Sequence, residues 1–217
     1  MILSIDGNIG SGKSTLFKSL KKYFSEDSNC NGKKIIFVDE PVEEWQKIKD
    51  KNGKNILECF YENPEKHSFS FQMLAYISRL SKLLTIIKKG EYDIIVTERC
   101  VFSDRNVFAK MLFDSGKMNE IEWQVYEMWF YNFLGELPRV YFIYLNTAPE
   151  LCFDRIKKRN RPGENIPLDY LKNCDTYHKI WLENPDKHVL ELDGSKDMSY
   201  HQLYINKIKQ LIVLNQV

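Results

Sequence analysis

The residues with the clearest chemistry lie near the start of the chain, where residues 7–15 read Gly-Asn-Ile-Gly-Ser-Gly-Lys-Ser-Thr. This is the G-x-x-x-x-G-K-[ST] spacing of a phosphate-binding loop, with a short apolar run before it and an amphipathic segment after it. Its glycines let the backbone turn tightly, so that successive N–H groups point at an anion. We expect Lys13 to reach the outer phosphates of a nucleoside triphosphate and the Ser14 hydroxyl to bind magnesium. The loop residues expected to hold the phosphates are Gly7, Asn8, Gly10, Ser11, Gly12, Lys13, Ser14 and Thr15.

A carboxylate follows the second apolar run of the chain. Glu40 lies just beyond residues 35–38, and the proline after it prevents the run from continuing as a central strand. Facing the end of a triphosphate, the Glu40 carboxylate could accept a proton from an attacking hydroxyl. The alternative is a surface acidic loop, and we prefer that interpretation for the neighbouring Glu43 and Glu44.

An acidic and a basic residue end the third apolar run. Glu98 and Arg99 follow residues 94–97, and such a pair is often only a structural ion pair. Beside a phosphate loop, however, the glutamate could hold magnesium, directly or through water. The arginine could bind a phosphate or orient the carboxylate that accepts the proton.

Three arginines lie in the segment from residue 155 to residue 161. Arg155 and Arg159 are four residues apart on one helix face, and Arg161 lies in a loop that leaves this helix. A solvated basic helix end would also suit the helix dipole. On a flap over a triphosphate, these side chains would instead neutralise the transferred group and exclude water.

Polar residues on an otherwise apolar helix indicate a second binding surface. Gln72 and Arg79 are seven residues apart, hence on one face, where they could read the edge of a planar ligand or simply make structural hydrogen bonds. Asp104, five residues after Arg99, is expected to pair with Arg79 at the floor of this pocket. The alternative for that pair is a buried ion pair with no role in recognition.

Strand-like apolar runs alternate with helical segments along the whole chain. The runs cover residues 2–5, 35–38, 94–97, 140–145 and 189–192. This alternation predicts one α/β domain, residues 1–217, with a doubly wound parallel sheet whose ligands bind beyond the carboxyl ends of the strands. Residues 69–87 and 120–134 are apolar on too many sides for surface helices. They are therefore expected to be central or to pack against a second subunit.

Composition limits the partners and the compartment. The 31 basic and 30 acidic side chains leave a net charge of +1, which argues against a nucleic-acid polymer or an anionic membrane as partner. The five cysteines are odd in number and scattered, as expected of free thiols in a reducing compartment. The first apolar run starts at residue 2, and none is long enough to span a membrane. We therefore expect no signal or transit segment and a cytoplasmic protein (in the host cell, if viral).

Five motifs occur in order over nearly the whole chain. They are residues 7–15, Glu40-Pro-Val with Trp45, residues 60–64 with 69–72, residues 98–105, and Arg155 to Arg161 with residues 166–171. In order and spacing these motifs resemble those of the cellular deoxynucleoside kinases, and they are most similar to those of the deoxycytidine and deoxyguanosine kinase branch. The resemblance implies a P-loop kinase with an arginine-rich lid at about residues 159–166. It also implies ATP or another triphosphate as donor, Mg²⁺, a small deoxynucleoside as acceptor, and a homodimer.

The resemblance also implies roles for individual residues. Glu40 would be the general base on the 5′-hydroxyl with Arg99 beside it, and Glu98 would hold magnesium together with Ser14. Gln72 would pair with the nucleobase. The other implied contacts are Val42, Trp45, Phe108, Arg79 and Asp104 around the base, Tyr61 and Glu164 at the sugar 3′-hydroxyl, Arg155, Arg159 and Arg161 in the lid, and Asp197 beside the donor.

The sequence departs from the family pattern at three places. Cys100 replaces the usual serine after Glu-Arg, and the chain begins directly at the first strand. The lid is one residue shorter than the family's and lacks its second acid, so the role of Glu164 depends on that shortened segment.

Two other functions fit a phosphate loop. Nucleoside monophosphate kinases of the thymidylate kinase type usually carry an arginine before the Glu-Pro pair, whereas Asp39 here would repel a monophosphate. A switch-type nucleotide binder would need an N-K-x-D guanine signature, which the sequence lacks.

The pair of Arg79 and Asp104 also bears on the choice of substrate. In the family that the chain resembles, such a pair marks kinases that accept deoxycytidine or deoxypurines. It would fill the space that the thymine 5-methyl group needs, and a pocket built on hydrogen bonds rejects ligands that leave its groups unpaired. We therefore expect thymidine to be a poor substrate.

Overall fold

The computed structural model describes residues 1–26, 32–161, 164–184 and 187–215. Five parallel strands form one sheet in the order β2-β3-β1-β4-β5. Their bounds are β1 Ile2–Asp6, β2 Ile35–Val38, β3 Ile94–Glu98, β4 Val140–Asn146 and β5 Val189–Asp193. All five predicted strands are confirmed, and β2 lies at an edge of the sheet.

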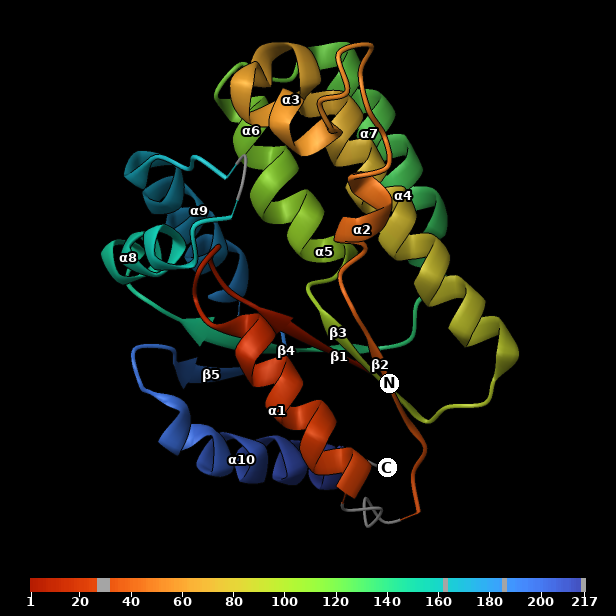
Figure 1. Cartoon of the computed structure of the whole chain (residues 1–217). Helices are drawn as coiled ribbons and strands as arrows, with labels where there is room; N and C mark the ends of the chain where they lie inside the picture. The colour runs from red at the N-terminus through yellow and green to blue at the C-terminus, as the bar shows by residue number, and fades with distance from the viewer. Residues whose placement is uncertain (27–31, 162–163, 185–186, 216–217) are drawn as a thin grey trace.

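Helices connect the strands and lie on both sides of the sheet (Figure 1). Before β3 come α1 Lys13–Glu26, α2 Val42–Trp45, α3 Ile56–Glu62 and α4 Pro64–Lys89. Between β3 and β4 come α5 Val101–Ser103, the π-helix η1 Asp104–Ala109, α6 Lys110–Asp114 and α7 Glu120–Leu134. After β4 come α8 Pro149–Arg159, α9 Leu168–Leu182, the 3₁₀ turn η2 Met198–Tyr200 and α10 His201–Leu214.

The sheet is buried on both faces, which explains why its strands are continuously apolar in sequence. On one face, α1 and α10 pack against β1, β3 and β4, with Leu16, Phe17 and Ile208 almost fully buried. On the other face, α4 packs against the β1–β3 side, while η1 and α9 pack against β4. The predicted α/β architecture is confirmed.

The sheet order brings the functional segments to one edge. β1 lies between β3 and β4, and Ile5 pairs in register with Glu98 on β3. The phosphate loop after β1 therefore lies beside the end of β3, and the segment after β2 lies one strand further on. Ligands of such sheets bind at this carboxyl edge, next to a strand whose two neighbours connect in opposite directions.

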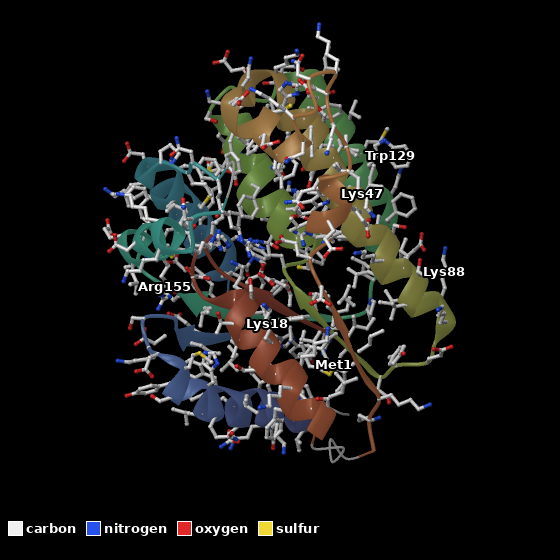
Figure 2. All side chains as sticks on the ribbon, in the orientation of Figure 1. Met1, Lys18, Lys47, Lys88, Trp129 and Arg155 are labelled. Carbon is white, nitrogen blue, oxygen red and sulfur yellow. The ribbon has the colours of Figure 1, made fainter. Side chains whose placement is uncertain are left out.

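The two strongly apolar helices, α4 and α7, pack against each other and leave an apolar surface exposed. The Tyr76 hydroxyl of α4 donates a hydrogen bond to the Trp129 carbonyl oxygen of α7 at 2.8 Å. Ile77, Met128 and Trp129 are 48%, 54% and 41% exposed, and Figure 2 shows Trp129 on the outer side of α7. Each helix is thus part of the core and also carries apolar side chains facing solvent, so the dimer stays a prediction.

The described residues also bear on the cysteines and on membrane spans. Cys59, Cys100, Cys152 and Cys174 are buried free thiols, as predicted, and Cys30 lies outside the described residues. Within the described ranges, no helix has the length and apolar character needed to cross a bilayer.

Candidate active site

The phosphate loop joins β1 to α1 and is packed closely on its neighbours. Gly7, Gly10 and Gly12 have φ values of 146°, 79° and 105°, a range that L side chains rarely adopt. A methyl group on Gly7 would come 2.6 Å from the Leu145 carbonyl oxygen, and one on Gly10 2.6 Å from that of Cys152. Side chains are therefore excluded at these positions, and the loop is fixed against β4 and α8.

Lys13 is held inside the loop. Its Nζ donates a hydrogen bond to the Asn8 carbonyl oxygen at 2.6 Å, while the Asn8 side-chain amide donates to the Leu171 carbonyl oxygen of α9 at 2.8 Å. Burial, and then the charge of Arg99, lower the pKa of the Lys13 ammonium to about 7. Phosphate oxygens bound in this loop would offer Lys13 a stronger partner than the carbonyl.

The two predicted magnesium ligands lie in direct contact. The Ser14 hydroxyl donates a hydrogen bond to Glu98 Oε1 at 2.7 Å. In the part of the chain that the structure describes, no group of three or more His, Cys, Asp or Glu side chains forms a metal site. The Ser14–Glu98 pair fits Mg²⁺ nonetheless, because this ion is commonly held by one or two carboxylates together with substrate phosphates and water.

Glu40 lies between two arginines. Arg79 Nη2 is 2.5 Å from Glu40 Oε1, and Arg99 Nε is 3.9 Å from the same oxygen. Burial alone would raise the pKa of the Glu40 carboxyl, but the charges of Arg79 and Arg99 lower it below its ordinary value. Glu40 is thus an ionised carboxylate at neutral pH and can accept a proton. Arg99 was expected beside it, whereas the closer contact with Arg79 was not.

The predicted pairing of Arg79 with Asp104 is confirmed. Arg79 Nε donates to the two Asp104 carboxylate oxygens at 3.1 and 3.0 Å, and Nη1 donates to the Glu98 carbonyl oxygen at 3.2 Å. Arg79 and Asp104 are 6% and 2% exposed. Burial raises the pKa of Asp104 to about 6, and the charge of Arg79 opposes this rise.

The residues predicted around the nucleobase come together near these arginines. The Arg79 guanidinium lies 5.2 Å from the Trp45 ring, and that of Arg99 lies 4.6 Å from the Phe108 ring. Val42 packs in the same apolar cluster as Trp45. Gln72 is buried, and its Oε1 has no hydrogen-bond partner among the described residues. A buried acceptor without a partner marks a position where a ligand donor would be satisfied.

Arg99 joins the end of β3 to the phosphate loop. Its Nη1 donates a hydrogen bond to the Gly7 carbonyl oxygen at 2.9 Å, and its backbone N–H donates to the Ile5 carbonyl oxygen at 3.0 Å. Its φ is 61°, a left-handed conformation that costs a non-glycine residue about 1–2 kcal/mol. The surrounding bonds hold this conformation and fix the guanidinium at the site.

The residues predicted at the sugar are near each other. Burial, and then the charge of Glu164, raise the pKa of the Tyr61 phenol, so it stays a hydrogen-bond donor. The Glu164 carboxylate accepts two hydrogen bonds from Arg159, one of them from Nε at 2.8 Å. The sequence did not indicate this contact between a proposed sugar ligand and a lid arginine.

The three arginines predicted for a lid have different environments. Arg155 on α8 donates from Nη1 to the carbonyl oxygens of Ser11 and Gly194 at 3.0 and 2.8 Å (Figure 2). Arg159 ends α8 and Arg161 is exposed. Of the predicted lid, residues 162 and 163 lie outside the described residues. Arg155 therefore contacts the phosphate loop already, whereas Arg159 is paired with Glu164.

Asp197, predicted beside the donor base, begins the short helix η2. Its Oδ1 accepts a hydrogen bond from the Ser199 backbone N–H at 2.9 Å and another from the Ser199 hydroxyl. The Asp197 carboxylate thus caps its own helix, and its contact with a donor stays a prediction.

Two buried titratable groups near the site were not among the predicted site residues. Asp6 is fully buried under the loop and accepts a hydrogen bond from the Ser4 hydroxyl at 2.5 Å, and burial raises its pKa. His178 on α9 is fully buried between aromatic rings, and its Nδ1 bonds the Cys174 carbonyl oxygen at 2.7 Å. The Asp6 position was visible in sequence as a polar residue ending an apolar run, whereas nothing distinguished His178 from a surface histidine of a helix.

Comparisons with a family model and with individual relatives indicate the same family. The model described as "Deoxynucleoside kinase" matches residues 3–215. "Deoxycytidine kinase 2" of Gallus gallus is 33% identical over 242 aligned residues, covering 99% of this chain and 88% of the relative. "Deoxycytidine kinase" of Homo sapiens is 34% identical, covering 97% of this chain and 90% of the relative. "Deoxyguanosine kinase, mitochondrial" of Xenopus laevis is 33% identical, covering 83% and 72%.

Proposed function

Since the chain belongs to the deoxynucleoside kinase family, we propose that it transfers a phosphoryl group from ATP to the 5′-hydroxyl of deoxycytidine or deoxypurine nucleosides in preference to thymidine. As a member of this family it is a phosphotransferase that phosphorylates deoxynucleosides for nucleotide salvage. The donor, the metal and the base preference are the parts proposed here. The observation that supports the proposed transfer most is the position of the Glu40 carboxylate, whose Oε1 lies 2.5 Å from Arg79 Nη2 and 3.9 Å from Arg99 Nε. Arg79 also contacts Asp104 of the predicted base pocket, and Arg99 contacts Gly7 of the phosphate loop.

In the proposed reaction, Glu40 accepts the proton of the 5′-hydroxyl as the oxygen attacks the terminal phosphorus of the donor. Lys13 and the lid arginines stabilise the negative charge that passes from donor to acceptor. The Ser14 hydroxyl and the Glu98 carboxylate would hold Mg²⁺, which when bound neutralises phosphate charge and orients the leaving group. Tyr61 and Glu164 bind the sugar 3′-hydroxyl and so fix the position of the 5′-hydroxyl.

The base preference rests on Gln72, Arg79 and Asp104. Gln72 offers a buried acceptor and an amide donor, which can pair with the edge of any of the four bases, so the discrimination against thymine comes from Arg79 and Asp104. The buried Arg79–Asp104 ion pair is rigid because three hydrogen bonds hold the guanidinium, and it leaves little room for a 5-methyl group. Deoxycytidine, deoxyadenosine and deoxyguanosine should therefore compete better than thymidine.

A competition assay with ATP and all four deoxynucleosides tests the proposed substrates. Replacing Glu40 by Gln should lower kcat by about 10²–10⁴-fold, the usual effect of losing a general base, while nucleoside binding stays within a few-fold. Glu43→Gln is the matched control, because Glu43 is an exposed neighbour on α2. Unchanged kcat in Glu40→Gln, or equal losses in both variants, would refute the assignment of Glu40.

The base preference has its own test. The double variant Arg79→Met with Asp104→Ala should raise the kcat/KM for thymidine relative to that for deoxycytidine. If the wild-type enzyme prefers thymidine, or if the double variant loses activity on all substrates equally, the specificity argument is wrong.

The thymidylate kinase alternative is disfavoured by the family comparison. Asp39 would repel a monophosphate only weakly, because its side chain is 68% exposed and pairs with Lys21 at 3.1 Å, so that water screens its charge. Deoxynucleoside monophosphates assayed beside the nucleosides should give no comparable turnover.

Three other expectations belong to this proposal. The chain forms one kinase domain with its lid at about residues 159–166, and the exposed apolar surface of α4 and α7 forms a homodimer interface. The cytoplasmic location stays a prediction.

A further inference from the structure

The Arg79 guanidinium is shared between two carboxylates that have different tasks in the proposed reaction. Its Nε donates to both oxygens of Asp104 at the floor of the base pocket, and its Nη2 lies 2.5 Å from Oε1 of Glu40. Arg79 is 6% exposed. Hydrogen bonds between charged groups are stronger in such a water-poor environment than on the surface.

The second arginine near Glu40 is not placed to do the same. Arg99 Nε is 3.9 Å from Glu40 Oε1, beyond hydrogen-bond distance, and Arg99 Nη1 is bonded to the Gly7 carbonyl oxygen at 2.9 Å. Glu40 itself follows an edge strand and is one quarter exposed. Its carboxylate therefore depends on Arg79 for a fixed orientation.

We infer that Arg79 is a positioning residue for the general base, holding the Glu40 carboxylate through the same guanidinium that forms the floor of the base pocket. This inference rests on the proposed function, in which Glu40 accepts the 5′-hydroxyl proton. It assigns Arg79 an effect on phosphoryl transfer that does not depend on which nucleobase is bound.

The charges around Glu40 give this role a measurable consequence. The charged and titratable groups that face it are Arg79 on α4, Arg99 after β3, Lys13 on α1, Asp104 on η1 and Tyr61 on α3. Removing the nearest cation leaves the carboxylate partly buried with less compensation. The pKa of Glu40 should then rise, since an opposite charge within hydrogen-bond distance normally lowers a carboxyl pKa by about 1–3 units.

The test compares the pH dependence of kcat for the wild type and for Arg79→Met, between about pH 4.5 and 8.5, with saturating ATP. The acid limb of the Arg79→Met profile should lie about one unit or more above that of the wild type. The shift should appear equally with deoxycytidine, deoxyadenosine and thymidine, because Glu40 acts on the 5′-hydroxyl that all three share. A role in base recognition alone would change KM differently for each nucleoside and leave the acid limb in place.

Two further variants keep the test decisive. Arg105→Met is the matched control, since Arg105 is the next arginine after Arg99 and pairs with Glu127 at 2.8 Å instead of with Glu40. Its acid limb should coincide with that of the wild type. Arg79→Lys, which keeps one cation, should fold even where the methionine variant does not, and should restore at least part of the shift. An unchanged acid limb in both Arg79 variants would overturn the inference.

Failure of this inference can be told from failure of the proposed function. If Glu40 is not the base, Glu40→Gln keeps its activity whatever Arg79 does. If Glu40 is the base and Arg79 does not position it, Glu40→Gln is inactive while both Arg79 variants keep the wild-type pH profile.

Discussion

His178 makes the stability of the fold depend on pH in a way that can be calculated. It is fully buried beside Tyr144, Phe108 and Trp181, whose ring centroids lie 6.0, 6.1 and 6.5 Å from its own. Burial, and then the positive charge of Arg99, lower its pKa from 6.5 to about 3. The native state therefore keeps His178 neutral where the unfolded chain already binds a proton.

The sign and size of the effect follow from this difference. The pKa of His178 is lower in the native state than in the unfolded chain. The contribution of neutral His178 to the free energy of unfolding is therefore fully present above about pH 6.5 and is lost as the pH falls toward about 3. Proton linkage with these two values gives a loss of about 0.8 kcal/mol at pH 6 and about 2 kcal/mol at pH 5. A loss of this size is a large fraction of the stability of an ordinary domain.

Urea unfolding followed by tryptophan fluorescence at about pH 5 and pH 7.5 measures the difference. His178→Phe fits the surrounding aromatic side chains and cannot be protonated, so its free energy of unfolding should fall by about 2 kcal/mol less than that of the wild type between the two pH values. The exposed His188 provides the control variant His188→Phe, which should keep the wild-type dependence. Equal losses in the wild type and in His178→Phe would refute this account of His178.

Three further predictions concern the donor site and the assembly. Lys13→Ala should weaken ATP binding and phosphoryl transfer without changing the melting temperature by more than a few degrees, whereas Lys18→Ala, an exposed change on the same helix, should change neither; full activity of the Lys13 variant would contradict its role. Ser14→Ala should raise the Mg²⁺ concentration needed for half-maximal activity, because the hydroxyl that contacts Glu98 is removed; an unchanged Mg²⁺ dependence would exclude Ser14 as a ligand. Light scattering of the wild type should give about twice the 25.8 kDa of one chain, and Trp129→Glu on the exposed apolar surface should shift the protein toward monomer. A wild-type monomer at micromolar concentration would rule out the dimer.

Much of the fold could be predicted because its signals are local. The five strands are continuous apolar runs, and residues 120–134 form the predicted helix with the same bounds. The segment from Gly7 to Ser14 could be recognised as a phosphate loop because the loop needs glycine where its backbone has positive φ values. The positions of Glu40 and Glu98 followed from the rule that parallel strands end at one edge of a sheet.

The contacts between distant elements could not be predicted in the same way. The hydrogen bond from Arg79 to Glu40 depends on the angle at which α4 crosses the end of β2. The packing of apolar surfaces between these elements sets this crossing angle. Spacing along α4 placed Arg79 and Gln72 on one face, but it could not show that the guanidinium reaches two carboxylates. The pairing of Arg159 with Glu164 depends in the same way on the path of the lid.

The close packing of Gly10 on Cys152 has a mechanical consequence for the catalytic cycle. No methyl group fits between the phosphate loop and the first turn of α8, and Arg155 ties the same helix to the loop and to Gly194. We therefore expect the loop and α8 to move together. A distance between labels on α1 and α8 should stay constant through every step of turnover.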